Sequence, residues 1–501
     1  MTKVVVTGIG IISSIGNNLQ ETYDSLVEER SGIGEIEILD TNHKGEFLVG
    51  EVSLSQDELI ELAQVDEKLT WTRTALLGII AAKEAISDSK INTKSNVALV
   101  SASTVGGMDR SELYYKDFLS NAKHSRYIDS HHAGNSTEMI AEQCGVDGLI
   151  TTISTACSSS VNSIMFGARL IKSGKSNIAI VGGTDALSKF TINGFNTLMI
   201  LDREHCRPFD ISRRGLNLGE GAAYLVLESM ESAIASGKKV YAEVSGYANA
   251  NDAHHQTASS ENGEGPFLAM KNALQTANLL PSQIDYINAH GTGTDNNDLT
   301  EGIAIKRLFK DNIPLFSSTK AYTGHTLGAA GVIESVISIL SLINNFIPPN
   351  INFSNPIEEI KLKPVTELLM PKQLSHVITN SFGFGGNDSS VIYSSANTSN
   401  DDVIHKSDAK KPIYIIGTSC VSPQDTLGGD LFSDDLKAER KLVSSKHIRI
   451  LRDFFNGTSV QTGQTVFWPY DFGIIPIETI SAIYERFLKP DDKSKGAFYT
   501  P

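Results

Sequence analysis

A cysteine stands where one pattern of secondary structure gives way to another. Cys157 follows an apolar, β-rich run over 149–153 and precedes a helical pattern over 161–171. A sulfur at such a junction faces the unpaired N–H groups of the helix and the positive end of its dipole, and both favour the thiolate. Its neighbours, Thr, Ala and Ser, are small and leave room for a substrate carbonyl. We therefore interpret Cys157 as a nucleophile, and a buried structural cysteine is the alternative.

Two histidines occur in contexts that match each other. His290 lies in the sequence Asn-Ala-His-Gly-Thr-Gly-Thr over 288–294, and His325 lies in the glycine- and hydroxyl-rich segment 317–331. Each segment follows an apolar, strand-like run, where loops carry chemistry on a rigid support. One thiol with two imidazoles that donate to an oxyanion or an enolate indicates acyl transfer.

Together with a glycine-rich segment near residue 384, these motifs resemble the β-ketoacyl-[acyl-carrier-protein] synthases of the elongating type, whose site holds one cysteine and two histidines. The resemblance extends from residue 3 to about Tyr393. The motifs that carry it, besides those of Cys157 and the histidines, are Cys206-Arg207-Pro208-Phe209-Asp210, Leu218-Gly219-Glu220-Gly221-Ala222 and Ser381-Phe382-Gly383-Phe384-Gly385-Gly386-Asn387.

The resemblance implies an α/β, thiolase-like fold with two similar halves in a five-layered αβαβα arrangement. Strand-like and helical patterns alternate along the chain, which independently predicts a mainly parallel sheet covered by helices. We place the first half, with the nucleophile, at 1–237 and the second half, with both histidines, at 238–395.

The composition changes after about Ser395. We interpret the polar, Ser- and Asn-rich stretch 396–411 as a linker and 412–501 as a poorly packed, non-catalytic extension, with a folded docking appendage as the alternative. The stretch 412–423 resembles the opening strand of a second ketosynthase-like subunit, and 475–501 resembles the lead-in of adenine-specific DNA methyltransferases. No catalytic motif of either family follows, so we expect a chain ending near Ser395 to keep its activity.

The resemblance also implies what individual residues do. Cys157 would accept the growing acyl chain, and the backbone N–H groups of Cys157 and Phe384 would form the oxyanion hole. His290 and His325 would hold the carbonyl of a malonyl thioester and stabilise the enolate that remains when carbon dioxide departs. Neutral imidazoles suit this task, because each then donates one N–H.

Supporting roles follow from the same resemblance. Lys320 and Glu334 would pair and position His325. Thr292 and Thr294 would bind the amides of the phosphopantetheine arm. Phe384 would gate the acyl pocket, since glycines on both sides let its backbone swing. Two further acids are interpreted as structural rather than catalytic, namely Asp298 and Glu301.

An acyl carrier protein is the partner that the resemblance implies, together with a homodimer or a heterodimer with a related ketosynthase-like subunit. The carrier protein brings the phosphopantetheine arm, so no cofactor of the chain's own is expected. The chain has four cysteines without paired spacing, which argues against a disulfide framework or a metal site. Candidate basic contacts for the carrier are Lys68, Arg73, Arg203 and Arg207.

The net charge and the hydropathy of the chain argue against nucleic-acid-binding and membrane-spanning proteins. A net charge of −15 makes nucleic acid an unsuitable partner, because phosphate contacts need a basic face. The start of the chain has no basic region before its apolar run, and the apolar stretch 332–347 is interrupted by Glu334. We therefore expect a cytoplasmic protein with no membrane span.

Three other members of the superfamily are weighed against the elongating synthase. A non-catalytic partner subunit of the chain-length-factor type would lack the cysteine, and it is kept as the alternative function. A degradative thiolase would need a second cysteine within 383–386, and an initiating synthase would have an asparagine in place of His325. The expected reaction is the decarboxylative Claisen condensation of malonyl-carrier protein with a Cys-bound acyl chain, in fatty acid or polyene-type polyketide biosynthesis.

Overall fold

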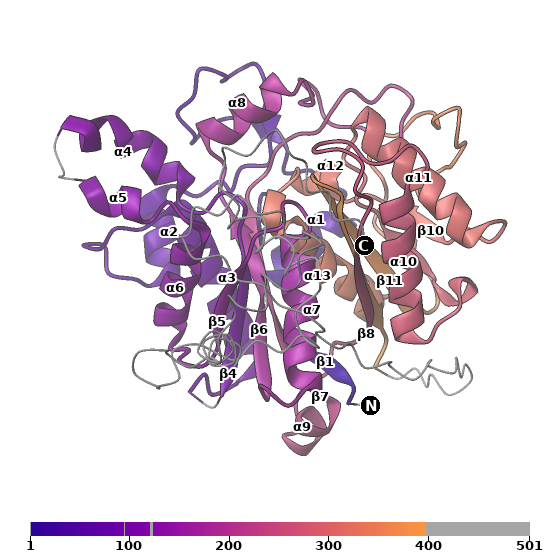
Figure 1. Cartoon of the computed structure of the whole chain (residues 1–501), viewed down its shortest axis with the longest axis horizontal. Helices are drawn as coiled ribbons and strands as arrows, with labels where there is room; N and C mark the ends of the chain where they lie inside the picture. Colours follow the sequence, from indigo (N-terminus) through magenta and orange to yellow (C-terminus); the bar gives the residue numbers. More distant parts are fainter. Residues whose placement is uncertain (1, 95, 121–123, 397–501) are drawn as a thin grey trace, which may run out of the picture. The chain divides into compact units, whose positions relative to one another are not determined.

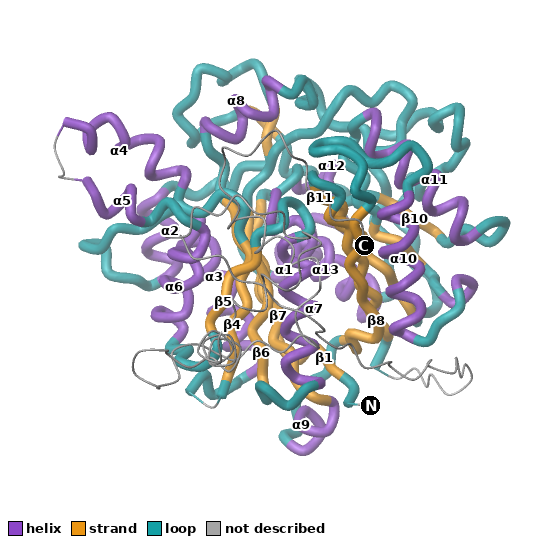
Figure 2. The backbone as a smooth tube through the Cα atoms, in the orientation of Figure 1, coloured by secondary structure: helices purple, strands orange, loops and turns teal. Residues whose placement is uncertain are grey.

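The computed structural model describes residues 2–94, 96–120 and 124–396. Its centre is a ten-stranded sheet with the strand order β10-β9-β11-β12-β8-β1-β7-β6-β4-β5, which runs through the middle of Figure 1 and Figure 2. Apart from Ala396, the predicted linker and C-terminal extension lie outside the described residues.

The sheet consists of two sets of five strands with the same internal order. The first set is β1 (Val4–Ser13), β4 (Val97–Ala102), β5 (Ile150–Ile153), β6 (Ile178–Asp185) and β7 (Gly221–Ser229). The second is β8 (Ala242–Asn251), β9 (Tyr286–Asn288), β10 (Leu315–Ser317), β11 (His376–Gly383) and β12 (Asn387–Ser394). Counted along the chain, both sets lie in the order first, fifth, fourth, second, third, and their first strands, β1 and β8, pair across the middle. This repeated order is the doubled plan that the thiolase-like fold requires.

Each set mixes parallel and antiparallel pairs, so the expectation of a mainly parallel sheet is wrong. In the first set β4 is parallel to β5 and β6, whereas β7 is antiparallel to β6 and β1. The second set repeats this pattern. The physical reason is clearest at β11 and β12, because a three-residue turn between them can only join antiparallel strands.

Helices form three of the five layers. The outer helix α3 (Arg73–Ser89) packs on β1 and β7, and α10 (Glu264–Ala277) packs on β8 and β12. Between the two sets of strands, α7 (Ser159–Lys172) and α13 (Ala330–Asn344) contact each other and strands of both sets. The central pair of helices therefore connects the region that carries the cysteine with the region that carries the histidines.

The close approach of α7 and α13 depends on small residues. A Cβ atom on Gly331 would lie 2.4 Å from Val161 Cγ2, so only glycine fits there, and the Val332 N–H donates to Ser160 Oγ at 3.0 Å. The segment Leu327–Asn344 is apolar and long enough to cross a bilayer, yet 89% of it is buried inside the protein. It is a core helix, because it lies between two sheet faces.

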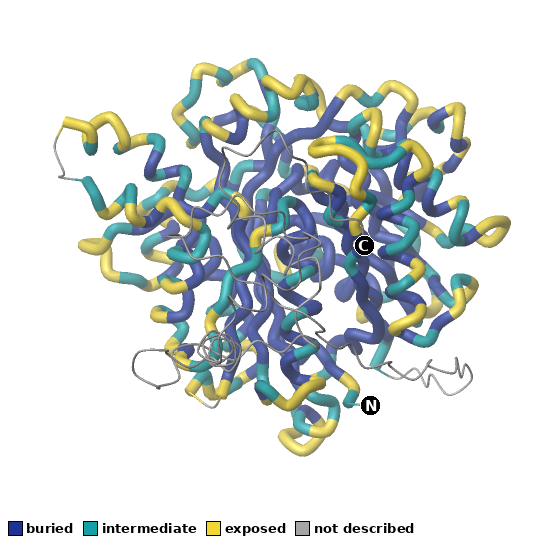
Figure 3. Tube along the Cα trace, in the orientation of Figure 1, coloured by how far each residue is buried: buried dark blue, intermediate teal, exposed yellow. Residues whose placement is uncertain are grey.

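The remaining elements lie around this core, and the burial colours of Figure 3 place the exposed backbone in the peripheral loops and helices. The boundary expected at 237/238 falls between α9 and β8. These elements are α1 (Leu19–Val27), β2 (Gly34–Glu35), β3 (Leu48–Val49), α2 (Gln56–Ala63), α4 (Met108–Ser120), α5 (Ser125–Asp129), α6 (Ala133–Cys144), α8 (Lys189–Thr197), α9 (Met230–Ala235), α11 (Asp295–Phe309), α12 (Lys320–Thr323) and the short 3₁₀ helices η2 (Pro281–Gln283) and η3 (Leu327–Ala329).

Candidate active site

Cys157 lies in the turn between β5 and α7. The preceding residue, Ala156, has a left-handed backbone with φ of 52°, a strained conformation for a residue with a Cβ. Side chains brace the turn, since Ser158 Oγ donates to the Thr155 carbonyl at 2.8 Å and Ser381 Oγ donates to the Cys157 carbonyl at 2.8 Å. The turn therefore holds the sulfur in one position, against the glycine-rich turn that follows β11.

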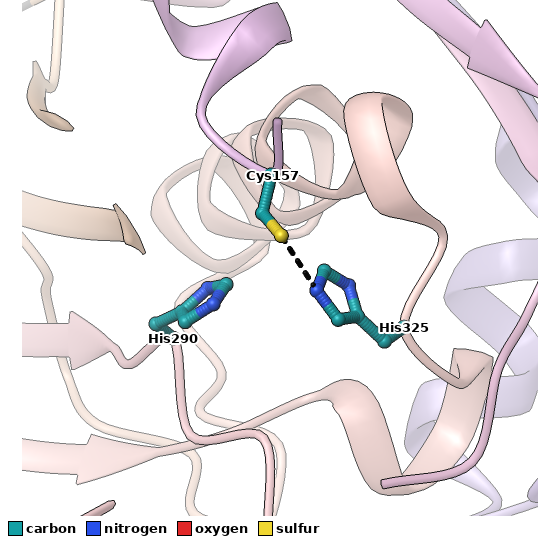
Figure 4. Close-up of side chains that lie close together, drawn as sticks. All are labelled: Cys157, His290 and His325. Atoms are coloured by element: carbon teal, nitrogen blue, oxygen red, sulfur yellow. Dashed lines mark hydrogen bonds between the residues drawn. The ribbon is translucent and has the colours of Figure 1, made fainter. Parts of the chain in front are cut away.

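The two histidines face this sulfur from the other set of strands. His290 follows β9, and His325 lies in the loop between α12 and η3. His325 Nε2 lies 3.0 Å from Cys157 Sγ, and the two imidazole rings are 5.4 Å apart between centroids, at 86° to each other. Figure 4 shows all three side chains pointing into one space. The convergence expected from the motifs is thus present.

Both imidazoles are neutral. Burial lowers the pKa of His290 and of His325 well below the usual histidine range, and the positive charge of Lys320 lowers both further. Lys320 Nζ lies 3.2 Å from His290 Nδ1 and donates to it, because an ammonium group has only donors. The His290 proton is then on Nε2, so that nitrogen is a donor.

The contact of Lys320 corrects one expectation. Lys320 was expected to position His325, which is close in sequence, but its ammonium group contacts the imidazole of His290. The reason is the short helix α12, which begins at Lys320 and directs this side chain back toward the end of β9.

Lys320 and Glu334 form the expected ion pair, in a site that excludes water. Both side chains are only 2% exposed, and the ammonium group contacts Glu334 Oε1 directly. The second carboxylate oxygen, Oε2, has no hydrogen-bond partner among the described residues. Burial raises the pKa of Glu334 to about 7, while the charge of Lys320 opposes that rise. Removing either partner would leave the other buried without compensation.

The protonation of Cys157 differs from the expectation of a thiolate. Burial raises the pKa of its thiol to about 11, although the charge of Lys320 and the backbone N–H groups of Phe384 and Cys157 lower it. The helix terminus does favour the thiolate, but the loss of hydration outweighs it. The two N–H groups directed at the sulfur belong to the residues expected to form the oxyanion hole.

Two buried acids brace the loop that carries His290. Glu301, on α11, accepts the N–H of His290 at 2.9 Å and that of Gly291 at 2.8 Å. Asp298 accepts the N–H of Phe209 at 2.7 Å and that of Gly293 at 3.2 Å. Burial raises the pKa of Glu301 to about 7. These contacts fit the structural role that the resemblance implied for both acids.

Asp185 is a supporting residue that sequence reasoning missed. It ends β6 and is fully buried, where it accepts hydrogen bonds from Ser103 Oγ at 2.6 Å and from the N–H of Gly328 at 2.7 Å. It thereby ties the loop after β4 to η3, close to His325. The available signal was an acid at the end of the apolar, glycine-rich run that forms β6.

A cavity of about 250 Å³ connects the three reactive side chains to the surface. Cys157 and both histidines form its buried floor. Phe384 forms a half-buried wall and stacks on Phe195, with ring centroids 6.0 Å apart. The hydroxyls of Thr292 and Thr294, 2.9 Å apart, lie along the same cavity. Residues at its exposed mouth include Leu198, Met199, Arg214, Asp295 and Asn296.

Comparisons with known proteins agree with this geometry. The profile "Beta-ketoacyl synthase, N-terminal domain" matches residues 1–233, and the corresponding C-terminal domain matches 241–354. A 3-oxoacyl-[acyl-carrier-protein] synthase 2 from Staphylococcus aureus (strain COL) is 33% identical over 407 residues, which cover 78% of this chain and 98% of the relative. The chain belongs to the β-ketoacyl synthase family. A Vibrio harveyi synthase 2 is 34% identical, with the same coverage.

Solved structures lead to the same family. The ishigamide ketosynthase/chain length factor has a TM-score of 0.73 and 31% identity, and the match covers 78% of this chain and 99% of that one. The ketosynthase ApeO, in complex with its chain length factor ApeC from Xenorhabdus doucetiae, has a TM-score of 0.68 and 29% identity, over 79% and 98% of the two chains. The synthase therefore has the thiolase-like fold, and it is an acyltransferase that forms 3-oxoacyl thioesters.

The candidate carrier-protein contacts of the synthase divide into exposed and buried residues. Arg73 is buried and pairs with Glu220 at 2.6 Å, so its proposed contact with a carrier protein is wrong. The prediction rested on charge alone, and the sequence does not show whether an arginine at the start of a helix faces solvent or a buried acid. Lys68 is exposed, Arg203 pairs with Glu46 at 2.9 Å, and Arg207 pairs with Glu204 at 2.6 Å.

The three reactive atoms of the synthase lie within 4.8 Å of one another, close enough to ligate a metal ion. The ammonium group of Lys320, 3.2 Å from His290 Nδ1, would repel a cation at this place. The expectation of a site without metal therefore stays a prediction that the local charge favours.

Proposed function

We propose that the synthase extends an acyl chain held on Cys157 by two carbons taken from malonyl-carrier protein, in fatty acid or polyene-type polyketide biosynthesis. The observation that carries the proposal is the convergence of one thiol, two neutral imidazoles and two backbone N–H groups on one cavity floor. A thiol, two hydrogen-bond donors for an enolate and an oxyanion hole are the groups that a decarboxylative condensation requires.

In the first step the sulfur of Cys157 attacks the carbonyl carbon of an acyl-carrier thioester. The N–H groups of Cys157 and Phe384 donate to the oxyanion of the tetrahedral intermediate. The bond to the carrier thiol breaks, and that thiol leaves with the proton that Cys157 gives up. His325 Nε2, 3.0 Å from the sulfur, is placed to take up this proton and pass it to the leaving thiol, which matters because burial raises the pKa of the thiol. The neutral ring then shifts its remaining proton from Nδ1 to Nε2, the nitrogen that donates in the second step.

In the second step a malonyl thioester places its carbonyl oxygen between His290 and His325. The bond to the carboxylate breaks, carbon dioxide leaves, and the electron pair forms an enolate that the two imidazoles stabilise by donating hydrogen bonds. The enolate carbon attacks the thioester on Cys157, and collapse of the intermediate releases the sulfur. The product remains on the carrier protein as a 3-oxoacyl thioester two carbons longer.

The walls of the cavity suit the substrate arm. Thr292 and Thr294 offer hydroxyls for the amides of phosphopantetheine, which arrives with the carrier protein, so the synthase needs no cofactor of its own. Phe384 stands between Gly383 and Gly385, and Gly385 has a φ of 81° that favours glycine. Rotation of this turn would move the ring of Phe384 away from Phe195 and open the acyl pocket.

The partners and location that we propose are an acyl carrier protein, a homodimer or a heterodimer with a related subunit, and the cytoplasm. A structurally similar assembly, AntDE:AntF, contains a type II PKS acyl-carrier protein in complex with its ketosynthase, and ApeO is in complex with its chain length factor. The presence of Cys157 favours the catalytic subunit over the non-catalytic alternative of the chain-length-factor type.

The test is condensation by the purified synthase. Acyl- and malonyl-carrier proteins are incubated with the enzyme, and the product is identified by mass, using saturated and polyunsaturated acyl primers in parallel. Extension by two carbons is expected, and the preferred primer distinguishes the two pathways. Cys157→Ala is the matched control. Equal product from the wild type and this variant would refute the proposed function.

A further inference from the structure

The mouth of the cavity carries one cationic side chain that the proposed reaction does not yet use. Arg214 lines the cavity and is exposed. Among the residues that the structure describes, its guanidinium has no hydrogen bond and no ion pair. The described residues that line the cavity include no other lysine or arginine, and both histidines there are neutral. Arg214 is therefore the one lysine or arginine among the described residues that line this cavity, and its charge interacts with the Asp202 carboxylate without an ion pair.

The backbone around Arg214 is held in place. The Gly215 N–H donates to the Gly293 carbonyl at 3.0 Å. On the other side, the guanidinium of Arg213 donates to the Asp295 carbonyl at 2.8 Å and to the Thr294 carbonyl at 3.2 Å. Arg214 thus extends from a segment whose backbone is tied to the loop following His290, and its guanidinium makes no hydrogen bond to the described residues.

Asp295, the acid that lines the mouth, forms no ion pair with Arg214. The carboxylate of Asp295 lies 3.9 Å from Arg213, and Arg213 is also the residue that clamps the loop. Leu198 and Met199 also line the mouth and are exposed, with Met199 at 86%, and neither carries a charge. The guanidinium of Arg214 therefore makes no ion pair at the mouth, although the acids Asp202 and Asp295 share this region.

The order of groups from floor to mouth matches that of the substrate arm. The floor holds Cys157, where the thioester must react, and the middle holds the hydroxyls of Thr292 and Thr294, where amides can bind. The outer end of a phosphopantetheine arm is a phosphodiester, an anion that has to lie at or near the mouth. Arginine is suited to it, because its planar guanidinium offers paired donors to phosphate oxygens.

We propose that Arg214 binds the phosphate at the outer end of the phosphopantetheine arm and so positions the thioester over the cavity floor. This inference rests on the proposed function and deepens it, since it identifies which part of the substrate the mouth recognises. Arg214 is a positioning residue, because it is distant from the reacting atoms and acts on substrate binding.

The test uses two malonyl thioesters that differ only in the phosphate, malonyl-phosphopantetheine and malonyl-pantetheine. Arg214→Ala should raise KM for the phosphorylated thioester about tenfold with kcat unchanged, and should leave both constants unchanged for the thioester without phosphate. Arg214→Lys should recover part of the loss, because it keeps the charge without the paired donors. Arg30→Ala is the control, since it removes a surface arginine that does not line the cavity.

A binding measurement separates this inference from the proposed reaction. Phosphopantetheine and pantetheine are compared as protectants of Cys157 against alkylation by iodoacetamide. The phosphorylated compound should protect at about tenfold lower concentration in the wild type, and this advantage should disappear in Arg214→Ala. An equal effect of Arg214→Ala on both compounds, or none, would overturn the inference. Loss of condensation with protection intact would overturn only the proposed function.

Discussion

The two sets of strands place different chemistry at equivalent positions. The third strand of the first set, β5, leads through the turn of Cys157 into α7. The third strand of the second set, β10, leads through the loop of Lys320 and His325 into α13. One framework, used twice, therefore brings the thiol of Cys157 and the imidazole of His325 to the same point from opposite sides.

The loops that follow the second strands of the two sets, β4 and β9, also differ in the groups that they carry. The loop after β9 carries His290 and is braced by Glu301. The equivalent loop after β4 contributes no reactive group, and it is bound by Asp185 through Ser103 and the backbone of Val105. The comparison shows that equivalent strands place their loops at equivalent positions, and that the side chains on each loop determine whether it takes part in the chemistry. In the proposed reaction the first half supplies the nucleophile, and the second supplies both imidazoles and the Phe384 N–H, and this division can be tested.

The largest effect is expected from the nucleophile of the first half. Cys157→Ala should lower condensation by at least about 10⁴-fold, because no other described thiol or hydroxyl at the cavity floor can hold the acyl chain. Decarboxylation of malonyl-carrier protein should continue, since both imidazoles remain. The measurement is the mass of the carrier-bound products. Loss of both activities in a folded variant would contradict the division between the halves.

The next effect concerns the buried ion pair of the second half. Lys320→Met should destabilise the protein by about 3–5 kcal/mol, because it leaves the Glu334 carboxylate buried without a partner. The double variant Lys320→Met/Glu334→Leu should recover most of that stability but not the decarboxylation rate, since His290 still lacks its Nδ1 donor. Urea unfolding and release of carbon dioxide are the two readouts. Full activity of the double variant would show that Lys320 has no role beyond the pair.

The rate of Cys157 acylation, rather than the rate of decarboxylation, should distinguish the roles of the two histidines. His290→Ala and His325→Ala should each lower decarboxylation by about 10²–10³-fold, because each removes one donor to the enolate. Only His325→Ala should also slow the acylation of Cys157, since its Nε2 lies 3.0 Å from the sulfur. Single-turnover acyl transfer from an acyl-carrier thioester measures this. Equal acylation rates in the two variants would remove the distinction.

The smallest effect is a pH dependence of stability that belongs to Glu301. Burial raises the pKa of Glu301 to about 7 in the folded protein, above the unfolded value of 4.5. The folded state then binds more protons than the unfolded state between these values, so this group's contribution is complete below about pH 4.5 and is lost as the pH rises through 7. The loss is about 1–3 kcal/mol in the free energy of unfolding.

Urea unfolding at pH 5 and pH 8, compared between the wild type and Glu301→Gln, measures this contribution. The glutamine does not titrate, so its stability should change less between the two pH values. A pH dependence equal to that of the wild type would assign the effect to other buried acids.

Residue types and local order were enough to predict the reactive groups and the alternation of strands and helices. Cys157, His290 and His325 stand out because their motifs are contiguous, and apolar runs ending in glycine are visible without any knowledge of contacts. The repeated strand order was not visible in this way, since it depends on pairings between distant segments.

By itself, the sequence determined which groups are available for chemistry, and the tertiary structure decided how each of them behaves. Only the fold shows that Lys320 contacts His290, that Arg73 is buried against Glu220 and that the thiol of Cys157 has a raised pKa. The physical reason is that protonation and pairing depend on burial and on charges brought close in space. Cys157 and His325 are 168 positions apart along the chain and 3.0 Å apart in the fold.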